Sequence, residues 1–526
     1  MLAKGPALAG PARIEPRAHG AARRGRFAVP GLVALGPVVK YAAGCAALGL
    51  AGALIAALVG PPPLAYPAPE RDWAPGGSAT VSLAPYPSSL RPAPSLARDE
   101  IPHFHAGKAL ARQPWIKAPT TTTARDGLGP LYNARSCLAC HVNGGRGHLP
   151  RGGDVVRASV LRLSLPANTR RLRAGVRAHP VYGGQIQGQS VALADQLGVA
   201  PAALGPGAEL EARAEAKVSL RWRERRYTYP DGATVTLRAP RPRLSRLGYG
   251  ALGDEVLLSL RHAPAIHGAG LIALIPEAAI LALADPADRD GNGVSGRANR
   301  VWSRSEQDWV LGRFGWKANM PDLEHTVAGA FAQDLGISNP LFPEGPCTAA
   351  QERCRRMATG AGDEGVELSA ALLQLVVDFT ANLGVPAARA QPAAAHAAGA
   401  ALFEQSGCAG CHTPSHVTGA SARYAHLGAQ RIWPYSDFLL HDMGAALADA
   451  RADYRASGRE WRTPPLWGAG LAAATNGAAH YLHDGRAATL EEAVLWHGGE
   501  AAPARDAFAR LDAPRRERLL AFVGSL

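Results

Sequence analysis

The sequence predicts a mainly α fold of two modules, with a β-rich insertion in the first module. Three observations lead to this prediction. Apolar side chains recur with helical spacing over 275–285, over 367–386 and in later segments. Residues 155–265 instead alternate apolar and polar side chains, which is typical of strands. A short cysteine and histidine motif occurs twice, at 137–141 and at 408–412, and we take each copy to mark one module.

The chain begins with a basic segment followed by an apolar run. Residues 1–40 carry a net charge of +6, and residues 41–60 contain no charged side chain. Twenty such residues are just enough to span a bilayer, with the preceding cations on the cytoplasmic side. A cleaved export signal is the alternative. Both interpretations predict a periplasmic protein, either anchored to the inner membrane by residues 41–60 or secreted after cleavage.

The rest of the positive charge gives no sign of a nucleic-acid partner. The chain has a formal net charge of +13, so residues 41–526 hold the remaining +7. We expect this excess to be spread thinly, because no basic helix is evident. The sequence therefore predicts no binding of nucleic acid.

The modules follow one another along the chain. After the segment 1–60, residues 61–110 are rich in proline and predict a linker. Residues 111–390 form the first module, in which Pro230–Gly232 predicts a turn between two strands of the insertion at about 155–265. Residues 391–526 form the second module. It begins with a helix that leads into the second motif, and we expect its last helix to pack on that first one.

Two cysteines outside the repeated motif predict a disulfide. Cys347 and Cys354 are seven residues apart in "PCTAAQERC". In an oxidising compartment a local disulfide is the expected state of such a pair. A redox-active pair is the alternative, but no neighbour is evident that would lower the pKa of either thiol.

The repeated motif has the pattern C-x-x-C-H, which is typical of covalent haem attachment. Two thiols one turn apart can reach the two vinyl groups of one porphyrin, and the adjacent histidine then binds the iron. A structural zinc site would need four protein ligands, and neither copy has a second C-x-x-C nearby. We therefore expect two covalently attached haem c groups in two cytochrome c-like haem domains. The residues are Cys137, Cys140 and His141 in the first motif and Cys408, Cys411 and His412 in the second.

Over most of residues 120–526 the chain resembles a known family. The resemblance rests on "DGLGPLYNARSCLACHVNGGRG", "HPVYGGQIQ", "IPEAAILALADPADRDGNGVSGRANRV", "GRFGWKAN", "PYSDFLLHDMG", "GREWRTPPLWG" and "YLHDGRAATLEEAVLWHGGEA". These stretches resemble those of the bacterial di-haem oxidoreductases of peroxidase type, also grouped as thiol oxidoreductases. That family is related to the di-haem cytochrome c peroxidases. The resemblance implies haem cofactors, an electron donor and a small oxidant.

The resemblance also implies a sixth ligand for the second haem. Related enzymes place a distal ligand soon after "HDGxxxTLEEAV", and in this chain that position is His497. Met443 is the alternative, because monohaem cytochromes place a methionine on such a downstream loop. Arg486 and Asp484 are expected to organise the haem propionates and the neighbouring loop.

The first haem has no such obvious ligand. "MPDLEHTVAGAF" resembles "ATLEEAVLWHGG" and places Ala330 where the second module has His497, which predicts an open or weakly ligated iron. The candidates for a sixth ligand are His325, Met320 and Lys317. His148 is instead expected at the surface or beside a propionate.

Two kinds of residue are candidates for chemistry at the first haem. Glu324 or Gln333 is proposed as the acid–base group that cleavage of a peroxide O–O bond requires, since a proton must move between its oxygens. A solvated carboxylate is the alternative for Glu324. Trp316 is proposed to lie between the haems and to assist electron transfer, with simple core packing as the alternative.

A further site is predicted in "DRDGNGVSGRAN". Asp288, Asp290 and Asn292 offer oxygen ligands at alternate positions before Gly293, as in an EF-hand-type calcium loop. Position twelve is Asn299 in place of the usual glutamate. A turn held by its aspartate side chains is the alternative to calcium.

Together these features predict a periplasmic di-haem c oxidoreductase. Electrons from a reduced cytochrome or another periplasmic donor would enter at the second haem and pass to the first. Hydrogen peroxide or a similar small oxidant would be reduced there. The alternative is a non-catalytic di-haem cytochrome that only relays electrons.

Overall fold

The computed structural model describes residues 73–82, 88–118, 120–121, 125–149, 158–191, 215–357 and 359–526. They belong to one compact unit, Ala65–Leu526. The predicted anchor or signal at 41–60 lies outside the described residues. Within the described ranges, no helix combines the length and the apolar character needed to cross a bilayer.

The helices are short, and none of those described is longer than 13 residues. They are α2 (Ile101–Arg112), α3 (Cys137–Cys140), α6 (Ala269–Ala273), α7 (Glu277–Leu281), α8 (Leu323–Ala330), α9 (Glu352–Arg355), α10 (Ala370–Ala381), α11 (Ala393–Gln405), α12 (Ala472–Asn476), α13 (Leu490–Trp496), α14 (Ala502–Arg510) and α15 (Ala513–Ser525).

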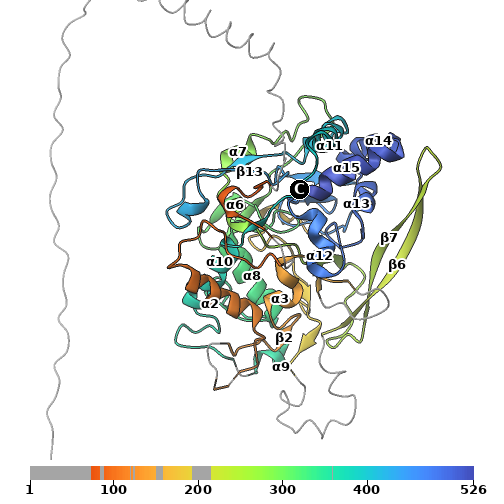
Figure 1. Ribbon diagram of the computed structural model, residues 1–526. Helices are drawn as coiled ribbons and strands as arrows, with labels where there is room; N and C mark the ends of the chain where they lie inside the picture. The colour runs from red at the N-terminus through yellow and green to blue at the C-terminus, as the bar shows by residue number, and fades with distance from the viewer. Residues whose placement is uncertain are drawn as a thin grey trace, which may run out of the picture. The chain divides into compact units, whose positions relative to one another are not determined.

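The first hydrophobic core forms where α2 crosses α10 (Figure 1). Phe104 of α2 packs against Phe379 of α10, with ring centroids 5.2 Å apart. The helices approach closely at Gly107, where a Cβ atom would overlap the carbonyl oxygen of Leu375. Helix α8 packs on α10 and adds Leu323, among other residues, to this core.

The second hydrophobic core repeats this arrangement. Helix α11 crosses α15, as expected from the sequence, and Phe403 packs on Phe522 with ring centroids 5.5 Å apart. A glycine, Gly399, again lies at the crossing, and a Cβ atom there would lie 2.5 Å from Cβ of Phe522. Helices α13 and α14 complete this core with Leu495 and Phe508, which are fully buried.

Helices α8 and α13 also correspond to one another, because both begin in the same way. The side chain of Asp322 accepts a hydrogen bond from the backbone N–H of His325 at the start of α8. Thr489 does the same for the N–H of Glu492 at the start of α13. Such caps bind one of the unpaired N–H groups of the first turn. Counted from these caps, Ala330 and His497 occupy the same position.

The strands form several small sheets. Those outside the insertion are β1 (Thr80–Val81) with β11 (Val385–Pro386), β9 (Arg300–Ser303) with β10 (Asp308–Leu311), β12 (His416–Val417) with β13 (Arg431–Ile432), and β14 (Leu440–Asp442) with β15 (Glu460–Arg462). Those inside or beside it are β2 (Leu131–Tyr132), β3 (Ser159–Ser164), β4 (Gln185–Ile186), β5 (Gln189–Ser190), β6 (Lys217–Thr228), β7 (Thr234–Ser245) and β8 (Leu257–His262).

The longest strands, β6 and β7, form the hairpin predicted from Pro230–Gly232 (Figure 1). At its turn, the N–H of Tyr229 donates to the carbonyl of Ala233, and Gly232 has φ +87°. The Asp231 carboxylate accepts a hydrogen bond from the N–H of Ala233 at 3.0 Å. These contacts explain why aspartate and glycine mark the turn.

The prediction of a mainly α fold with two cytochrome c-like domains is wrong. Of the described residues, 30% are helical and 19% lie in strands, spread over many small sheets. Many strands are only two residues long and pair with distant segments, as Thr80 does with Val385. Strands this short have no alternating pattern in the sequence, so only the helical segments were recognisable. The expected share of helix was therefore too high.

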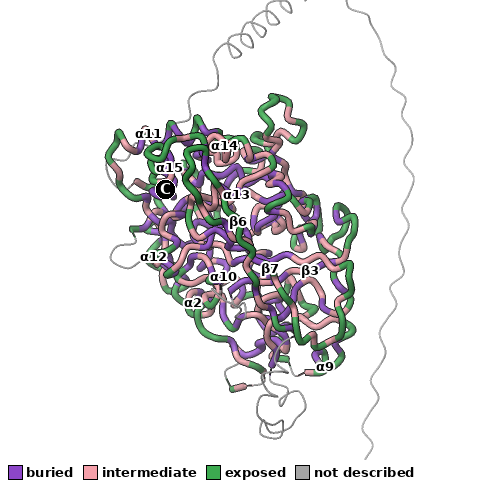
Figure 2. Tube along the Cα trace, turned by 90° about the vertical axis from the view of Figure 1, so that its right-hand side faces the viewer, coloured by how far each residue is buried: buried purple, intermediate pink, exposed green. Residues whose placement is uncertain are grey.

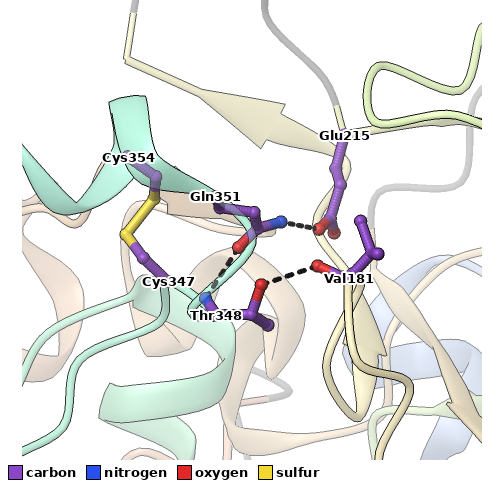
Figure 3. Close-up of a disulfide and its surroundings, with 6 residues drawn as sticks. All are labelled: Val181, Glu215, Cys347, Thr348, Gln351 and Cys354. Carbon is purple, nitrogen blue, oxygen red and sulfur yellow. Dashed lines mark hydrogen bonds between the residues drawn. A yellow bond between two sulfur atoms is a disulfide. The ribbon is translucent and has the colours of Figure 1, made fainter.

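The predicted disulfide between Cys347 and Cys354 is confirmed (Figure 3). Its loop is tied to the insertion on both sides. Thr348 donates to the carbonyl of Val181 at 2.8 Å, and Gln351 donates to the buried carboxylate of Glu215 at 2.5 Å. Burial raises the pKa of Glu215 to about 7, against the opposing effect of its hydrogen bonds.

Replacing Gly107 by alanine should destabilise the protein. The new methyl group would meet backbone atoms of α10, which cannot rotate away as a side chain can. We expect a loss of about 1–3 kcal/mol, typical of overpacking in a core. Chemical denaturation of the haem-loaded protein would measure it. Alanine at Gly362, which has open space around it, is the control and should change stability little.

Candidate functional site

The first motif presents His141 directly after the single turn of α3. The N–H of His141 donates to the carbonyl of Cys137 at 2.9 Å, which closes the turn between the two thiols. The ring Nδ1 lies 2.7 Å from the carbonyl oxygen of Pro264, so Nδ1 carries the proton. Burial lowers the pKa of His141, so the ring is neutral. Its Nε2 lone pair is therefore available to a metal ion.

The second motif has the same local geometry. Nδ1 of His412 lies 2.8 Å from the carbonyl oxygen of Tyr435, and burial lowers the pKa of His412 to about 4. His497 lies at the end of α13 and is close enough to His412 to contribute to this lowering. Nδ1 of His497 in turn lies 2.7 Å from the carbonyl oxygen of Ala493. Both rings thus keep Nε2 as a potential metal ligand.

Met443, the alternative ligand, lies in the same region. It is half-buried against the second core, as Cys408 is. Its carbonyl oxygen would lie 3.1 Å from a Cβ atom at Gly498, the residue after His497. The structure therefore brings both predicted ligands to the second motif. The histidine pair is favoured because both rings have their Nδ1 atoms bound to carbonyls.

Cys411 also has polar neighbours, Asp437 and His441, and these three could be taken for a metal site. His441 Nε2 lies 2.8 Å from Asp437, and its Nδ1 lies 2.9 Å from Glu500. Burial disfavours the charged ring, but these hydrogen bonds outweigh it and raise the pKa of His441 to about 12. A protonated histidine cannot bind a metal ion. The group is therefore a buried ion cluster beside Cys411.

A cavity of about 310 Å³ opens beside the first motif. Cys137, Cys140 and His141 line it from one side. Helix α8 lines it with Leu323, Thr326, Val327 and Ala330. Most of the remaining wall is apolar and comes from the segments around 261–272 and 464–475.

Several half-buried arginines line this cavity with few anions near them. Burial lowers the pKa of Arg162 and Arg462 to about 10, and it also lowers that of Arg146. Nη1 of Arg146 and Nε of Arg162 have no hydrogen-bond partner. A buried cation without a counter-charge is costly. A large flat apolar ring with two carboxylates would fill the cavity and supply the missing anions, so these residues fit a haem.

One acidic side chain lines this cavity among the described residues, and it is Asp334. It lies in the π-helical turn Phe331–Leu335 that follows α8. Gln185 donates to its Oδ1 at 2.8 Å and also to the carbonyl of Gln333. The backbone carbonyl of Asp334 accepts hydrogen bonds from the N–H groups of Asn133 and Ala134. The carboxylate is thus held in place at the cavity wall.

The acid–base candidates predicted from sequence lie elsewhere. Glu324 is exposed on α8 and is not among the residues that line the cavity. Gln333 accepts a hydrogen bond from Arg162, and it does not line the cavity either.

The candidates for a sixth ligand at the first site differ in position. Met320 and Ala330 line the cavity. His325 is buried against Phe342, with ring centroids 5.1 Å apart, and is not among the residues that line the cavity. Lys317 is fully buried and donates to Asp449 and to two carbonyls, so its amine is already bound. His148 is exposed.

Trp316 connects the two sites. It lines the cavity of the first site and also belongs to the second hydrophobic core. Its indole N–H donates to the carbonyl of His262 at 2.7 Å, which fixes the ring. Arg486 lies beside the second site, where it forms an ion pair with Asp484 and stacks on Trp496, the neighbour of His497.

The predicted calcium loop is exposed, and its side chains bind its own backbone. Asp288 accepts from the N–H of Gly293, Asp290 from that of Asn292, and Asn292 from that of Val294. Asn299 is buried elsewhere. These contacts are the ones expected of a turn held by its own side chains, which was the alternative to a calcium site. Calcium binding stays a prediction.

Sequence reasoning missed Asp334 and the arginines of the cavity. A signal did exist, because the stretches that carry the family resemblance include Arg146, Gln185 and Arg462. Those positions were not assigned a role because only the fold brings them to one cavity.

Replacing His441 by glutamine should destabilise the protein. The change leaves Asp437 and Glu500 without their cation, and breaking a buried pair costs about 3–5 kcal/mol. Despite burial, hydrogen bonds from His441 and Ser295 lower the pKa of Glu500 to about 2. The Glu500 carboxylate therefore contributes fully to the free energy of unfolding above about pH 4.5, and this contribution is lost as the pH falls towards 2.

Denaturation of wild type and variant at pH 7 and at pH 3 would measure this effect. The difference in stability should be largest at pH 7 and smaller at pH 3. A variant as stable as wild type at pH 7 would contradict the prediction.

The comparisons with known proteins agree with this geometry. Residues 74–526 match a family model described as "Di-haem oxidoreductase, putative peroxidase". Searches of curated proteins and of solved structures found no match. The family match extends over both motifs and the cavity, so this chain belongs to the di-haem oxidoreductases.

Proposed function

We propose that this protein is an exported di-haem c peroxidase. Electrons from a reduced donor enter at the second site, around His412 and His497, and pass to the first site at His141. Hydrogen peroxide or a similar small oxidant is reduced there. The observation that carries the proposal is the asymmetry of the two sites: His497 ends α13 beside His412, whereas Ala330 at the matching position of α8 lines an open cavity.

The residues of the first site have defined tasks in this proposal. A haem bound there would supply the electrons and the coordination site for peroxide. Cys137 and Cys140 would hold the ring through thioether bonds. Burial raises the pKa of both to about 12, so the free thiols are protonated. His141 would bind the iron, and Arg146 and Arg462 would bind the carboxylates.

Proton movement and electron supply are assigned to two further residues. Asp334 is positioned by Gln185 to move a proton between the oxygens of peroxide, which cleavage of the O–O bond requires. Trp316 lies between the sites and lines the route for electrons. Ala330 leaves space for the oxidant where the second site has a histidine.

An exported location is supported by two features. The basic segment and the apolar run at 41–60 are typical of an anchor or export signal. The disulfide between Cys347 and Cys354 is of a kind that persists in oxidising compartments.

The proposal is tested on the purified protein loaded with both haems. We expect one low-spin haem and one high-spin haem in the electronic and electron paramagnetic resonance spectra. Adding hydrogen peroxide should oxidise a reduced c-type cytochrome continuously. Two low-spin haems in every redox state, with no turnover, would contradict the proposal and indicate an electron carrier.

A further inference from the structure

The net positive charge of residues 41–526 is concentrated in the β6–β7 hairpin. Residues 217–246, which include β6 and β7, contain nine lysines and arginines against Glu224 and Asp231, a net charge of +7. This equals the whole excess of residues 41–526, so the other residues after 40 have no net charge. The expectation that the excess is spread thinly is therefore wrong.

Most of these cations lie on one face of the hairpin. In its register Arg221 is directly opposite Arg241, and Ser219 is opposite Arg243. Directly opposed residues share a face, as do residues two apart along a strand. The basic face therefore includes Lys217, Arg221, Arg223, Arg241 and Arg243, all of which are exposed. Nearer the tip the same face packs on the second core through Leu237.

Nothing in the described structure offsets these charges. None of the five has a carboxylate within 4.0 Å among the described residues. Arginines placed directly opposite one another destabilise a ribbon, so stability does not explain Arg221 and Arg241. An excess of unpaired exposed cations on a rigid element is instead typical of a surface that attracts an anionic partner.

The hairpin is fixed at both ends and is rigid for that reason. At its base, Val218 and Leu220 on the face opposite the cations are buried in a small core. At its tip, Tyr229 donates to Glu491 of α13 at 2.8 Å, and Arg516 of α15 binds Asp231. Figure 2 shows β6 and β7 side by side across this face of the molecule, with exposed residues along them.

The tip of the hairpin also connects the basic face to the second site. Arg225 lies over the ring of Trp496, with its guanidinium carbon 4.3 Å from the ring centroid. Trp496 directly precedes His497. A partner bound on the hairpin would therefore lie beside the helix that ends at the second site.

We propose that the basic face docks an acidic electron-donor protein that delivers electrons to the second haem. The inference rests on the proposed function, because it assigns the place of electron entry. An anionic membrane is the less favoured partner. Basic elements that bind membranes also insert apolar side chains, and the exposed large apolar residues of the described chain, Leu172, Leu281, Leu283 and Val417, all lie outside the hairpin.

The test uses the haem-loaded protein with Arg221→Glu, Arg223→Glu and Arg241→Glu combined. The probe is a reduced acidic c-type cytochrome oxidised by hydrogen peroxide at low ionic strength. We expect KM for this cytochrome to rise roughly tenfold or more with kcat unchanged, since steering by charge alters encounter rates by factors of 10–10³. Salt should raise the wild-type KM and hardly affect the variant.

Two controls separate docking from other effects. Turnover with a small uncharged reductant should be the same in wild type and variant. Combined Arg170→Glu, Arg171→Glu and Arg177→Glu makes the same change of charge on another exposed segment and should leave KM unchanged. An unchanged KM in the hairpin variant, or an equal rise in the control variant, would overturn the inference.

Further measurements test whether the basic face binds a membrane or DNA instead, and whether docking holds even if the protein does not reduce peroxide. If the hairpin variant loses binding to phosphatidylglycerol vesicles or to DNA but keeps its KM, the docking inference is wrong. If the wild type does not reduce peroxide, binding of the acidic cytochrome is measured directly by titration. Salt-sensitive binding that the variant loses would then still support docking, and absence of binding would contradict it.

Discussion

Replacing His497 by alanine is expected to change the second haem from low-spin to high-spin. His497 lies beside His412, and each ring has its Nδ1 bound to a backbone carbonyl. A carbonyl bound in this way fixes the orientation of a ring and directs Nε2 to the metal. Removing the second ring removes a strong-field ligand, so the electron paramagnetic resonance signal of a low-spin haem should disappear.

The same variant should lose most of its turnover with a protein donor. A closed iron transfers electrons with little rearrangement, and an open one takes up water or oxidant. We expect peroxide-dependent oxidation of a reduced cytochrome to fall by about tenfold or more, with both haems still bound.

Met443→Leu is the matched control for His497, because Met443 lies in the same region and is the other ligand candidate. Leucine has nearly the same volume but no sulfur atom to bind iron. We expect this variant to keep the low-spin signal and the wild-type rate. The reverse pattern, with the signal lost in Met443→Leu and kept in His497→Ala, would assign the ligand to Met443.

The sequence predicted the features that depend on neighbouring residues. The hairpin between β6 and β7 follows from its turn residues, and the packing of α11 on α15 follows from apolar periodicity at the two ends of the second module. The disulfide follows from the spacing of Cys347 and Cys354. The turn, the two helices and the disulfide need only short-range information, whereas the pairing of α11 with α15 was expected because they begin and end the second module.

The features that the sequence did not predict depend on distant pairings. The small sheets join segments that are far apart, as β1 and β11 are, and such pairs carry no local signal. The cations of the hairpin are interleaved with other residues and form no long continuous run, so the sequence alone does not predict a basic face. A strand places alternate residues on one face, so the cluster appears only once the register is known.

The candidate site divides in the same way. The cysteines and histidines of the two motifs could be assigned because the C-x-x-C-H spacing alone indicates haem attachment. Glu324 is a candidate acid from its place in "MPDLEHTVAGAF", but helix α8 leaves its side chain exposed. Asp334 lies one π-helical turn beyond α8, and the turn could not be foreseen from composition.

Asp334→Asn is expected to reduce the rate of peroxide reduction strongly. Asp334 is the acidic side chain among the described residues of the cavity, and Gln185 holds it in place. Asparagine keeps the shape and can still accept this hydrogen bond, but it cannot move a proton. Loss of a positioned acid–base group costs about 10²–10⁴-fold in rate. Stopped-flow measurement of peroxide reduction by the fully reduced protein would show it.

Two observations would separate a role in proton movement from a structural role. First, Asp334→Glu keeps a carboxylate at this position and should retain part of the rate that Asp334→Asn loses. Second, Asp334→Asn should leave the spectra of both haems unchanged. Glu324→Gln is the matched control, since Glu324 lies on the exposed side of α8 and should be dispensable. Only Asp334 of the two lines the cavity, so Glu324→Gln should keep the wild-type rate. An equal loss of rate in both variants would contradict the assignment of the acid to Asp334.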